Sequence, residues 1–383
     1  MRDVMTELEA WWRAGESVGV GTVVGTWKSA PRQPGASMLV GPEGTAVGSV
    51  SGGCVEGAVY ELAEVARDDG APVLQRYGVS DDDAFVVGLT CGGIIDIYVE
   101  QVNQDTFPEL GDIAQDIRAG RPVAVATLIS GAGPERLGRR LVVREDGASG
   151  SLGSDRLDDA VRDDVEGMLL LGQTGIVHYG PDGERRGDDI AVFVAAYAPP
   201  PRMIVFGAID FAAAVARIGA FLGYRVTVCD ARPTFATAKR FPDADEVVVE
   251  WPHRYLRDTE VDARTVVCVL THDPKFDVPL LELALRLPVA YVGAMGSRRT
   301  NDDRLKKLRE LGLSEDELAR LHAPIGLDVG ARTPEETAIS VAAELIAARW
   351  NGSGAQLRKI DGAIHHELDH GGNTGVTGGN DPS

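Results

Sequence analysis

Cysteine is scarce in this chain of 383 residues, which contains four of them, and that scarcity excludes a disulfide framework. Long apolar runs are missing too, because the longest fall well short of the roughly 18–20 residues that a membrane span requires. The first 12 residues carry three acidic side chains and lack the apolar segment of a secretory signal. These absences predict a protein of the reducing cytoplasm with unpaired thiols.

Basic side chains are in the minority, since 38 Lys and Arg face 58 Asp and Glu and the net charge is −20. Such a negative surface repels nucleic acid and anionic membranes, so neither is expected as a general partner. A small anionic ligand would need a locally basic pocket. The hydrophobic fraction of 44% is ordinary for a globular protein, and the length predicts two or three domains.

The best domain boundary is a run of three prolines at 199–201, which is stiff and cannot donate backbone hydrogen bonds. Residues 1–198 are expected to form an α+β domain. From 201 to 350 strands and helices alternate, which predicts a Rossmann-type α/β domain with a parallel sheet covered on both faces. Residues 351–383 turn glycine-rich and polar and are expected to be a mostly disordered tail.

Hydrophobic periodicity and turn residues predict the individual elements. In the first domain we expect helices at 4–14, 55–67, 109–119 and 157–170, and strands at 18–27, 36–40, 45–50, 94–99, 123–129, 139–144 and 190–196. In the second we expect strands at 202–206, 225–229, 265–270 and 289–292, with helices between them. A capping box with proline at its first helical position, 333–336, predicts a last helix that runs to about residue 348.

Two cysteines lie beside glycine pairs: Cys54 directly follows Gly52 and Gly53, and Cys91 directly precedes another pair. A strand, a Gly-Gly turn and then a helix place Cys54 at a helix N-terminus, where unpaired amides stabilise a thiolate and attract an anion. Each cysteine could instead be a structural residue beside a tight turn. Their separation does not match zinc-ligand spacing, so metal binding by thiolates alone is not expected. Arg32, in a proline-containing loop, is a further candidate for cofactor binding.

The turn after the first Rossmann strand begins at Gly207, where the dinucleotide fingerprint G-x-G-x-x-G/A is expected. Asp230 ends the second strand, at the place of a ribose-binding acid. Ile209, however, occupies the position of the second glycine, where backbone must approach a pyrophosphate. The sequence therefore leaves open a Rossmann fold that no longer binds a dinucleotide.

A second glycine-containing turn, with Gly296, Ser297, Arg298 and Arg299, follows a predicted strand and opens a helix. Amides, a hydroxyl and two arginines there are suited to a phosphate, whereas arginines in a merely solvated first turn oppose the helix dipole. His272 lies just past another strand's carboxyl end, the edge at which open α/β sheets bind ligands. It could contact a ligand or carry a proton, or it could belong to a turn stabilised by the aspartate that follows.

Several of these segments together resemble the XdhC/CoxI family, accessory proteins of molybdenum hydroxylases such as xanthine dehydrogenase and aerobic carbon monoxide dehydrogenase. The resemblance covers most of the chain to about residue 349. It rests on GSVSGGCVE at 48–56, LTCGG at 89–93, THD at 271–273, YVGAMGSRR at 291–299, PIGLD at 324–328 and TPEE at 333–336. One segment departs from the family, which usually has Gly-Ala-Gly-His where this chain has Gly-Ala-Ile-Asp at 207–210.

The resemblance implies an N-terminal XdhC/CoxI domain followed by a Rossmann domain. It also implies that the protein binds the molybdenum cofactor (molybdopterin), protects its sulfurated form and hands it to an apo-hydroxylase. Cys54 and Cys91 match the family's glycine-flanked cysteines. A soft thiolate suits a molybdenum centre, and amides with arginines suit a pterin phosphate.

Two other functions stay open from the sequence. The Rossmann fold is common among NAD(P)-dependent oxidoreductases, but a fold does not by itself decide function, and Ile209 argues against this alternative. The second open function is that of a degenerate scaffold, which only binds its partner enzyme. The sequence thus predicts a pterin or nucleotide-like small ligand and an apo-hydroxylase partner, and it leaves open both catalysis and a homodimer.

Overall fold

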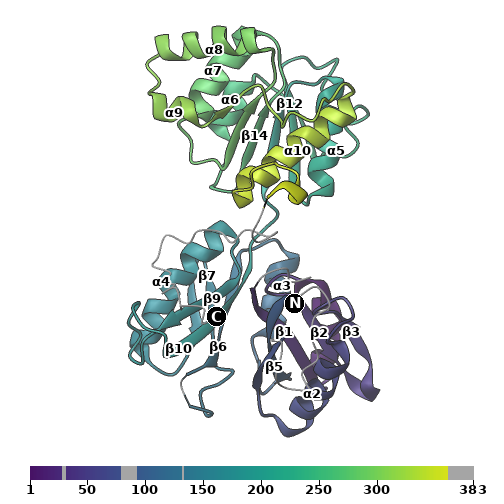
Figure 1. Cartoon of the computed structure of the whole chain (residues 1–383), viewed down its shortest axis with the longest axis vertical. Coiled ribbons are helices and arrows are strands. Elements are labelled where there is room, and N and C mark those ends of the chain that lie inside the picture. Colours follow the sequence, from purple (N-terminus) through teal and green to yellow (C-terminus); the bar gives the residue numbers. More distant parts are fainter. Residues whose placement is uncertain (28–31, 79–92, 132, 361–383) are drawn as a thin grey trace. The chain divides into compact units, whose positions relative to one another are not determined.

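The computed structural model describes residues 1–27, 32–78, 93–131 and 133–360. The chain divides into two compact units, Met1–Pro200 and Pro201–Ser383 (Figure 1). We describe each unit by itself. No helix in the described part of the chain is long and apolar enough to cross a membrane.

The described residues of the first unit form two antiparallel sheets of five strands each. In spatial order the first sheet consists of β3 (Ala46–Gly48), β2 (Ser37–Val40), β1 (Val18–Trp27), β5 (Ile94–Val102) and β4 (Val73–Tyr77). The second consists of β8 (Gly147–Gly150), β7 (Arg140–Arg144), β6 (Val123–Ser130), β10 (Ile190–Tyr197) and β9 (Gly175–Tyr179).

Strand alternation sorts the side chains of this unit into layers. On β5, Ile95 and Ile97 pack with Val59 of α2 (Glu56–Asp69), whereas Tyr98 faces the second sheet and packs with Phe193. The far face of the second sheet is covered by α4 (Asp155–Leu171). Helices α1 (Met5–Arg13) and α3 (Leu110–Arg118) close one side of the core between the sheets. The predicted α+β domain is confirmed.

The glycines of β1 have a specific packing role. A Cβ atom at Gly19 would overlap the carbonyl group of Ala63 on α2, and one at Gly21 would lie 2.7 Å from a methyl of Val59. Because glycine lacks Cβ, α2 can approach the strand closely. This contact fixes the position of α2, and the loop that contains Cys54 directly precedes that helix.

The second unit is built on a parallel sheet of six strands. In spatial order they are β13 (Glu246–Val249), β12 (Arg225–Asp230), β11 (Arg202–Phe206), β14 (Val266–Val269), β15 (Tyr291–Ala294) and β16 (Leu321–His322). Numbered within the unit, this is the order 3-2-1-4-5-6 of the Rossmann fold, with its switch point between β11 and β14. The predicted Rossmann-type parallel sheet is confirmed.

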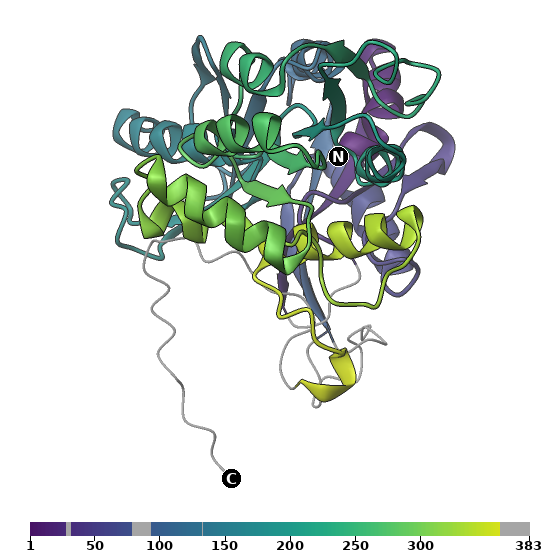
Figure 2. The ribbon, with the colours of Figure 1, turned by 90° about the horizontal axis from the view of Figure 1, so that it is seen from above.

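Helices cover both faces of this sheet (Figures 1 and 2). On one face lie α5 (Asp210–Phe221) and α10 (Pro334–Trp350), which share an apolar cluster with the strands. On the other lie α6 (Pro252–Asp258), α7 (Pro274–Ala284), α8 (Arg298–Glu310) and α9 (Glu315–Ala319). The predicted capping box is present, because the Thr333 side chain accepts from the Glu336 amide and the Glu336 carboxylate accepts from the Thr333 amide.

Five strands of the described residues have no counterpart among the expected elements. They have two to five residues each and stand at the edges of their sheets: β4, β8, β9, β13 and β16. All four residues of β8 are exposed, and β16 has two residues. Of the expected tail, the structure describes 351–360, which includes a short 3₁₀ turn, Leu357–Lys359.

The close approach of α2 to β1 gives a testable expectation. Gly19→Ala should destabilise the first unit by about 2–3 kcal/mol, because the added methyl collides with backbone that cannot move without shifting α2. The matched control is Gly57→Ala, since Gly57 lies in α2 with open space around its missing Cβ. The control should stabilise by up to about 1 kcal/mol. Scanning calorimetry of both variants checks this, and equal unfolding temperatures would contradict it.

Candidate functional site

The loop that carries Cys54 is organised around one carboxylate. Glu56, the first residue of α2, accepts hydrogen bonds from the backbone amides of Ser51 (2.9 Å), Gly52 (2.9 Å) and Gly53 (2.8 Å). The Ser51 hydroxyl also donates to Glu56 and accepts from the Cys54 amide at 3.0 Å. The backbone amides of this loop thus surround the Glu56 carboxylate.

This arrangement differs from the expectation for Cys54. The helix begins at Glu56 with Val55 as its N-cap, so Cys54 lies one residue before the cap. The Val55 amide also reaches Glu56, at 3.2 Å. The amides predicted to attract an external anion therefore already bind an internal one.

The same hydrogen bonds set the charge state of Glu56. Burial by itself raises the pKa of this carboxyl, but hydrogen bonds from the Ser51 and Ser49 side chains and from backbone amides outweigh it and lower the pKa to about 2. Glu56 is therefore ionised at any physiological pH and stays available to hold the loop.

Among the described cysteines, Cys54 is the one that solvent reaches. Cys229 and Cys268 are fully buried, and burial raises the pKa of each thiol to about 12, which makes them inert. Cys54 is half-buried. Its neighbours Gly52 and Gly53 are exposed and have positive φ values, and a Cβ on either would meet no atom of the described residues within 4 Å. This open space suits an incoming ligand.

Two further predicted residues of the first unit have different outcomes. Cys91 lies outside the described residues. Arg32 lies near the amino group of Met1, whose pKa is lowered to about 5, chiefly by burial and in smaller part by the charge of Arg32. Within the described segments, no hydrogen bond or ion pair joins Arg32 to the Cys54 loop.

At the first Rossmann turn, Asp230 is fully engaged with protein groups. Its carboxylate accepts from the Ala208 amide at 2.7 Å and binds both Nε and Nη2 of Arg232, at 2.9 and 2.7 Å. Its side chain is 3% exposed. An acid held in this way has no position left for a ribose hydroxyl. Gly207 has a φ of +108°, and a Cβ there would lie 2.9 Å from a Thr271 methyl.

Ile209 is the N-cap of α5 and is half-buried against the apolar cluster beneath that helix. It provides no side-chain hydrogen bond to the helix, and the next residue, Asp210, adds a negative charge to the first turn. Both features make this helix start unfavourable for a pyrophosphate.

The carboxyl ends of β14 and β15 are joined by a buried ion pair. Arg304 of α8 and Asp277 of α7 lie 2.9 Å apart, and their side chains are 3% and 4% exposed. The Thr271 hydroxyl donates to Asp277, and Arg304 also donates to the Met295 carbonyl at 3.0 Å. The pair thus brings together two segments that the sequence analysis selected separately, 271–273 and 293–299.

His272 and the arginine-rich turn lie at this edge of the sheet. His272 is exposed and close enough for its charge to act on Asp277. Ser297 is the N-cap of α8 and accepts from the Thr300 amide at 3.1 Å. Arg298 and Arg299 follow it in the first turn and are exposed. The described part of the chain contains no group of three or more His, Cys, Asp or Glu arranged to hold a metal ion.

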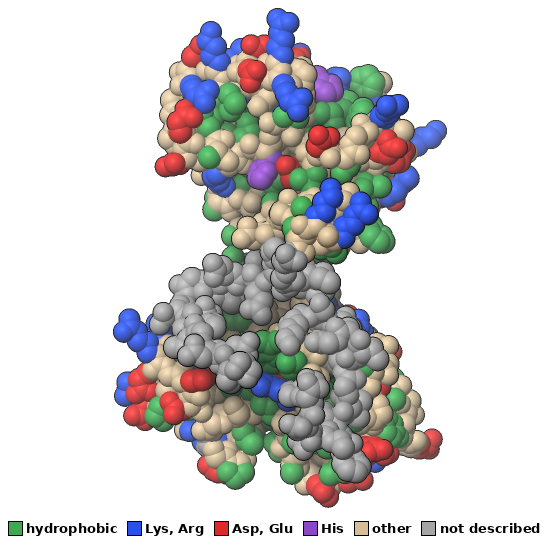
Figure 3. Space-filling view, viewed as in Figure 1, with side chains coloured by type: hydrophobic (Ala, Val, Ile, Leu, Met, Phe, Trp, Pro, Cys, Tyr) green, Lys and Arg blue, Asp and Glu red, His purple; other side chains and the backbone are tan. Residues whose placement is uncertain are grey.

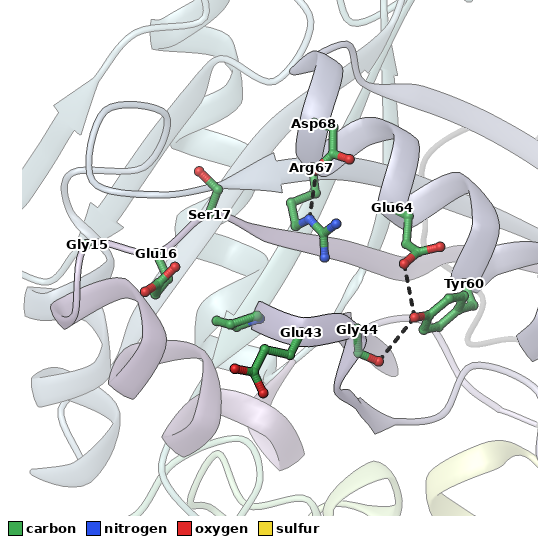
Figure 4. A pocket seen from close by; sticks show the side chains of 10 residues that line it. Gly15, Glu16, Ser17, Glu43, Gly44, Tyr60, Glu64, Arg67 and Asp68 are labelled. Atoms are coloured by element: carbon green, nitrogen blue, oxygen red, sulfur yellow. Dashed lines mark hydrogen bonds and ion pairs between the residues drawn. The ribbon is translucent and has the colours of Figure 1, made fainter.

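One pocket lies in the first unit and contains none of the predicted site residues. Its volume is about 630 Å³, and it is lined by Gly15, Glu16, Ser17, Pro42, Glu43, Gly44, Tyr60, Glu64, Arg67 and Asp68 (Figure 4). Two of its donors are already used, because Tyr60 bonds to Glu64 and Arg67 pairs with Asp68. The remaining acidic lining disfavours an anionic ligand.

Sequence reasoning missed Glu56, Asp277 and Arg304. Glu56 had a weak signal, a serine five residues before an acid at a predicted helix start. Asp277 and Arg304 had none, because each is an ordinary charged residue within a helix and their pairing spans 27 positions.

Comparisons with known proteins agree on one family. The model of the XdhC and CoxI family matches residues 11–78 and 116–180, and that of the XdhC Rossmann domain matches residues 203–345. The chain is 27% identical over 351 residues to a probable xanthine dehydrogenase subunit of Bacillus subtilis strain 168, covering 91% of this chain and 98% of the relative.

Two more matches extend over most of the chain. It is 28% identical over 336 residues to the molybdenum cofactor insertion chaperone PaoD of Escherichia coli K12, covering 88% of this chain and 85% of PaoD. The crystal structure of a xanthine dehydrogenase from Bacillus halodurans is similar with a TM-score of 0.64 and 26% identity, covering 90% of this chain and 95% of that one.

The Glu56 carboxylate should make the first unit sensitive to acid. The folded pKa of about 2 lies below the usual 4.5, so this stabilisation is complete above pH 4.5 and is lost as pH falls toward 2. Glu56→Gln should lower stability at neutral pH by about 2 kcal/mol and flatten this acid dependence. Glu61→Gln, on the exposed face of the same helix, is the control. Urea unfolding at several pH values checks both, and parallel curves for the Glu56 variant and wild type would refute the expectation.

Because Asp230 is already bound to the Ala208 amide and to Arg232, we expect that the first Rossmann turn does not bind a dinucleotide. Wild type should show no micromolar NAD⁺ or NADH binding by calorimetry. Ile209→Gly should not create it, because Arg232 and the Ala208 amide still occupy Asp230. Micromolar binding by wild type would contradict the expectation and revive the oxidoreductase alternative. Binding by the variant alone would show that Ile209, rather than Asp230, blocks the ligand.

Proposed function

The chain belongs to the XdhC and CoxI family, and from that premise we propose that it binds the molybdenum cofactor as cargo and delivers it to the apo-form of a molybdenum hydroxylase. The resemblance to a relative named as a molybdenum cofactor insertion chaperone, over 88% of this chain, supports the accessory role. The observation that carries the proposal is the half-buried Cys54 on its braced glycine loop.

The donor set of the loop fits the metal end of such a cargo. Molybdenum in the cofactor accepts soft ligands, and a cysteine thiolate is the soft ligand that proteins supply. The glycines before Cys54 leave room on one side, since no atom in the described part of the chain lies within 4 Å of a Cβ at Gly52 or Gly53. The loop does not fit the phosphate end, because Glu56 already holds its amides.

The hydrogen bonds to Glu56, which hold the backbone of the Cys54 loop, have a function in this proposal. A chaperone must bind its cargo without a large reorganisation, or the ordering of a flexible loop would subtract from affinity. Five hydrogen bonds to Glu56 and Ser51 fix the backbone on both sides of the thiol. A single protein thiolate is also a displaceable ligand, which suits transfer to a second protein.

An oxidoreductase function has less support. It would require a dinucleotide at the first Rossmann turn, where Ile209 and the paired Asp230 stand. The strand order alone favours it, and strand order is shared by proteins of many functions.

Removal of the Cys54 thiol should reduce cargo loading without loss of the fold. We expect Cys54→Ser, purified anaerobically from cells that make the cofactor, to retain at most about a tenth of the wild-type molybdenum and pterin. The matched control is Cys268→Ala, which removes a thiol that is fully buried in the second unit. Molybdenum is measured by elemental mass spectrometry and pterin by the fluorescence of its oxidised form.

The control should load as wild type does. Equal loading of Cys54→Ser and wild type would overturn the role of this thiol. Loss of loading in both variants would indicate that stability, rather than the Cys54 thiol, controls binding.

A further inference from the structure

Two helices of the second unit start at the carboxyl edge of the sheet in opposite electrostatic surroundings. At α5, the Ala208 amide is taken by Asp230, and Asp210 stands in the first turn. At α8, the first turn contains Arg298 and Arg299 and no acidic residue. Since a helix start attracts anions through its amides and dipole, α8 is the better anion site.

The start of α8 is a well-formed helix terminus. Ser297 caps it through the Thr300 amide, and the helix continues for 13 residues. The amides of Arg298 and Arg299 lie in the first turn, where no helical carbonyl stands four residues earlier to accept from them, so they point out of the helix end. Basic side chains project from the end of the second unit where α8 lies (Figure 3).

A buried guanidinium lies directly beneath this turn. Arg304 uses Nη2 for Asp277 and for the Met295 carbonyl. Its Nη1 is buried and has no hydrogen-bond partner among the described residues. A Cβ at Gly296 would lie 3.7 Å from Nη1 and 3.4 Å from the Thr300 side chain, so this donor lies next to the turn. A buried donor without a hydrogen bond lowers the stability of the fold. Such a group in a native structure indicates a partner that binds there.

We propose that the turn Gly296–Arg299, with Arg304 beneath it, binds a phosphate or pyrophosphate group, and that the anion site of this Rossmann unit has moved from the start of α5 to the start of α8. The ligand class is a phosphate monoester or diphosphate. Exposed Arg298 and Arg299 contact the anion from outside, and Arg304 supports it from below.

This inference deepens the proposed function only in so far as the cargo carries a phosphate; its own evidence lies in the second unit and does not involve Cys54. A nucleotide would present the same chemistry. Inorganic pyrophosphate and ADP are therefore the probes, since neither contains molybdenum or a pterin.

The first test removes the outer charges. Calorimetric titration of the full chain with pyrophosphate should show that Arg298→Ala/Arg299→Ala raises the dissociation constant about tenfold and weakens its dependence on salt between about 50 and 200 mM. The matched control is Lys306→Ala/Lys307→Ala, which removes the same charge from exposed positions on the same helix. The control should change the dissociation constant by less than about twofold. Equal effects of the two variants, or no binding of either probe by wild type, would overturn the site.

The second test addresses Arg304 at constant net charge. Asp277→Leu/Arg304→Met replaces the whole buried pair, which proteins often tolerate, whereas loss of Arg304 alone would strand Asp277. Arg304→Lys keeps the pair but has no second nitrogen to extend beneath Gly296. Both variants should bind pyrophosphate at least about threefold more weakly, with an unchanged calorimetric unfolding transition. Wild-type affinity in Arg304→Lys would overturn the role of Arg304.

The outcomes separate this inference from the proposed function. Cys54→Ser should bind pyrophosphate as wild type does, because its loop belongs to the other unit. Loss of molybdenum loading without loss of pyrophosphate binding supports both proposals. Normal loading with an absent pyrophosphate site would refute only the second.

Discussion

The Glu56 carboxylate is the interaction on which the character of the first unit's site depends. A glycine-rich turn before a helix exposes backbone amides, and such amides ordinarily bind a phosphate or another external anion. Here an acidic side chain from the helix itself occupies them, and its low pKa keeps it charged. The turn is thereby stabilised, and its amides are unavailable to other anions. The glycines of β1 allow α2 to dock closely enough to hold this assembly in place.

The second unit uses the same principle at its first turn. Asp230 binds the Ala208 amide and Arg232, so an internal ion pair stands where a dinucleotide would be recognised in related folds. Internal carboxylates thus satisfy two of the three glycine-containing turns that the sequence selects. The α8 turn is different, because its acid, Asp277, lies below the turn and pairs with Arg304, which leaves the outer arginines facing solvent.

Much of the fold could be predicted because its signals are local. The strands at 18–27 and 202–206 were expected with the bounds that the structure has, since both are β-branched runs ended by turns. The last helix was expected from its capping box. Marginal strands such as β8 and β16 were missed because pairing with a neighbour, rather than their own composition, makes them strands.

The sequence by itself determined the domain order, the alternation that produces a parallel sheet, and which turns carry glycine, cysteine and arginine. Each of these follows from the periodicity of neighbouring residues. Tertiary structure alone decided which of those turns already hold an anion. That outcome depends on where a side chain five or 22 residues away is directed, as for Glu56 and Asp230, and on the pairing of Asp277 with Arg304 across two helices. Hydrogen bonds form between groups that folding brings within about 3 Å, and distance along the chain does not report that separation.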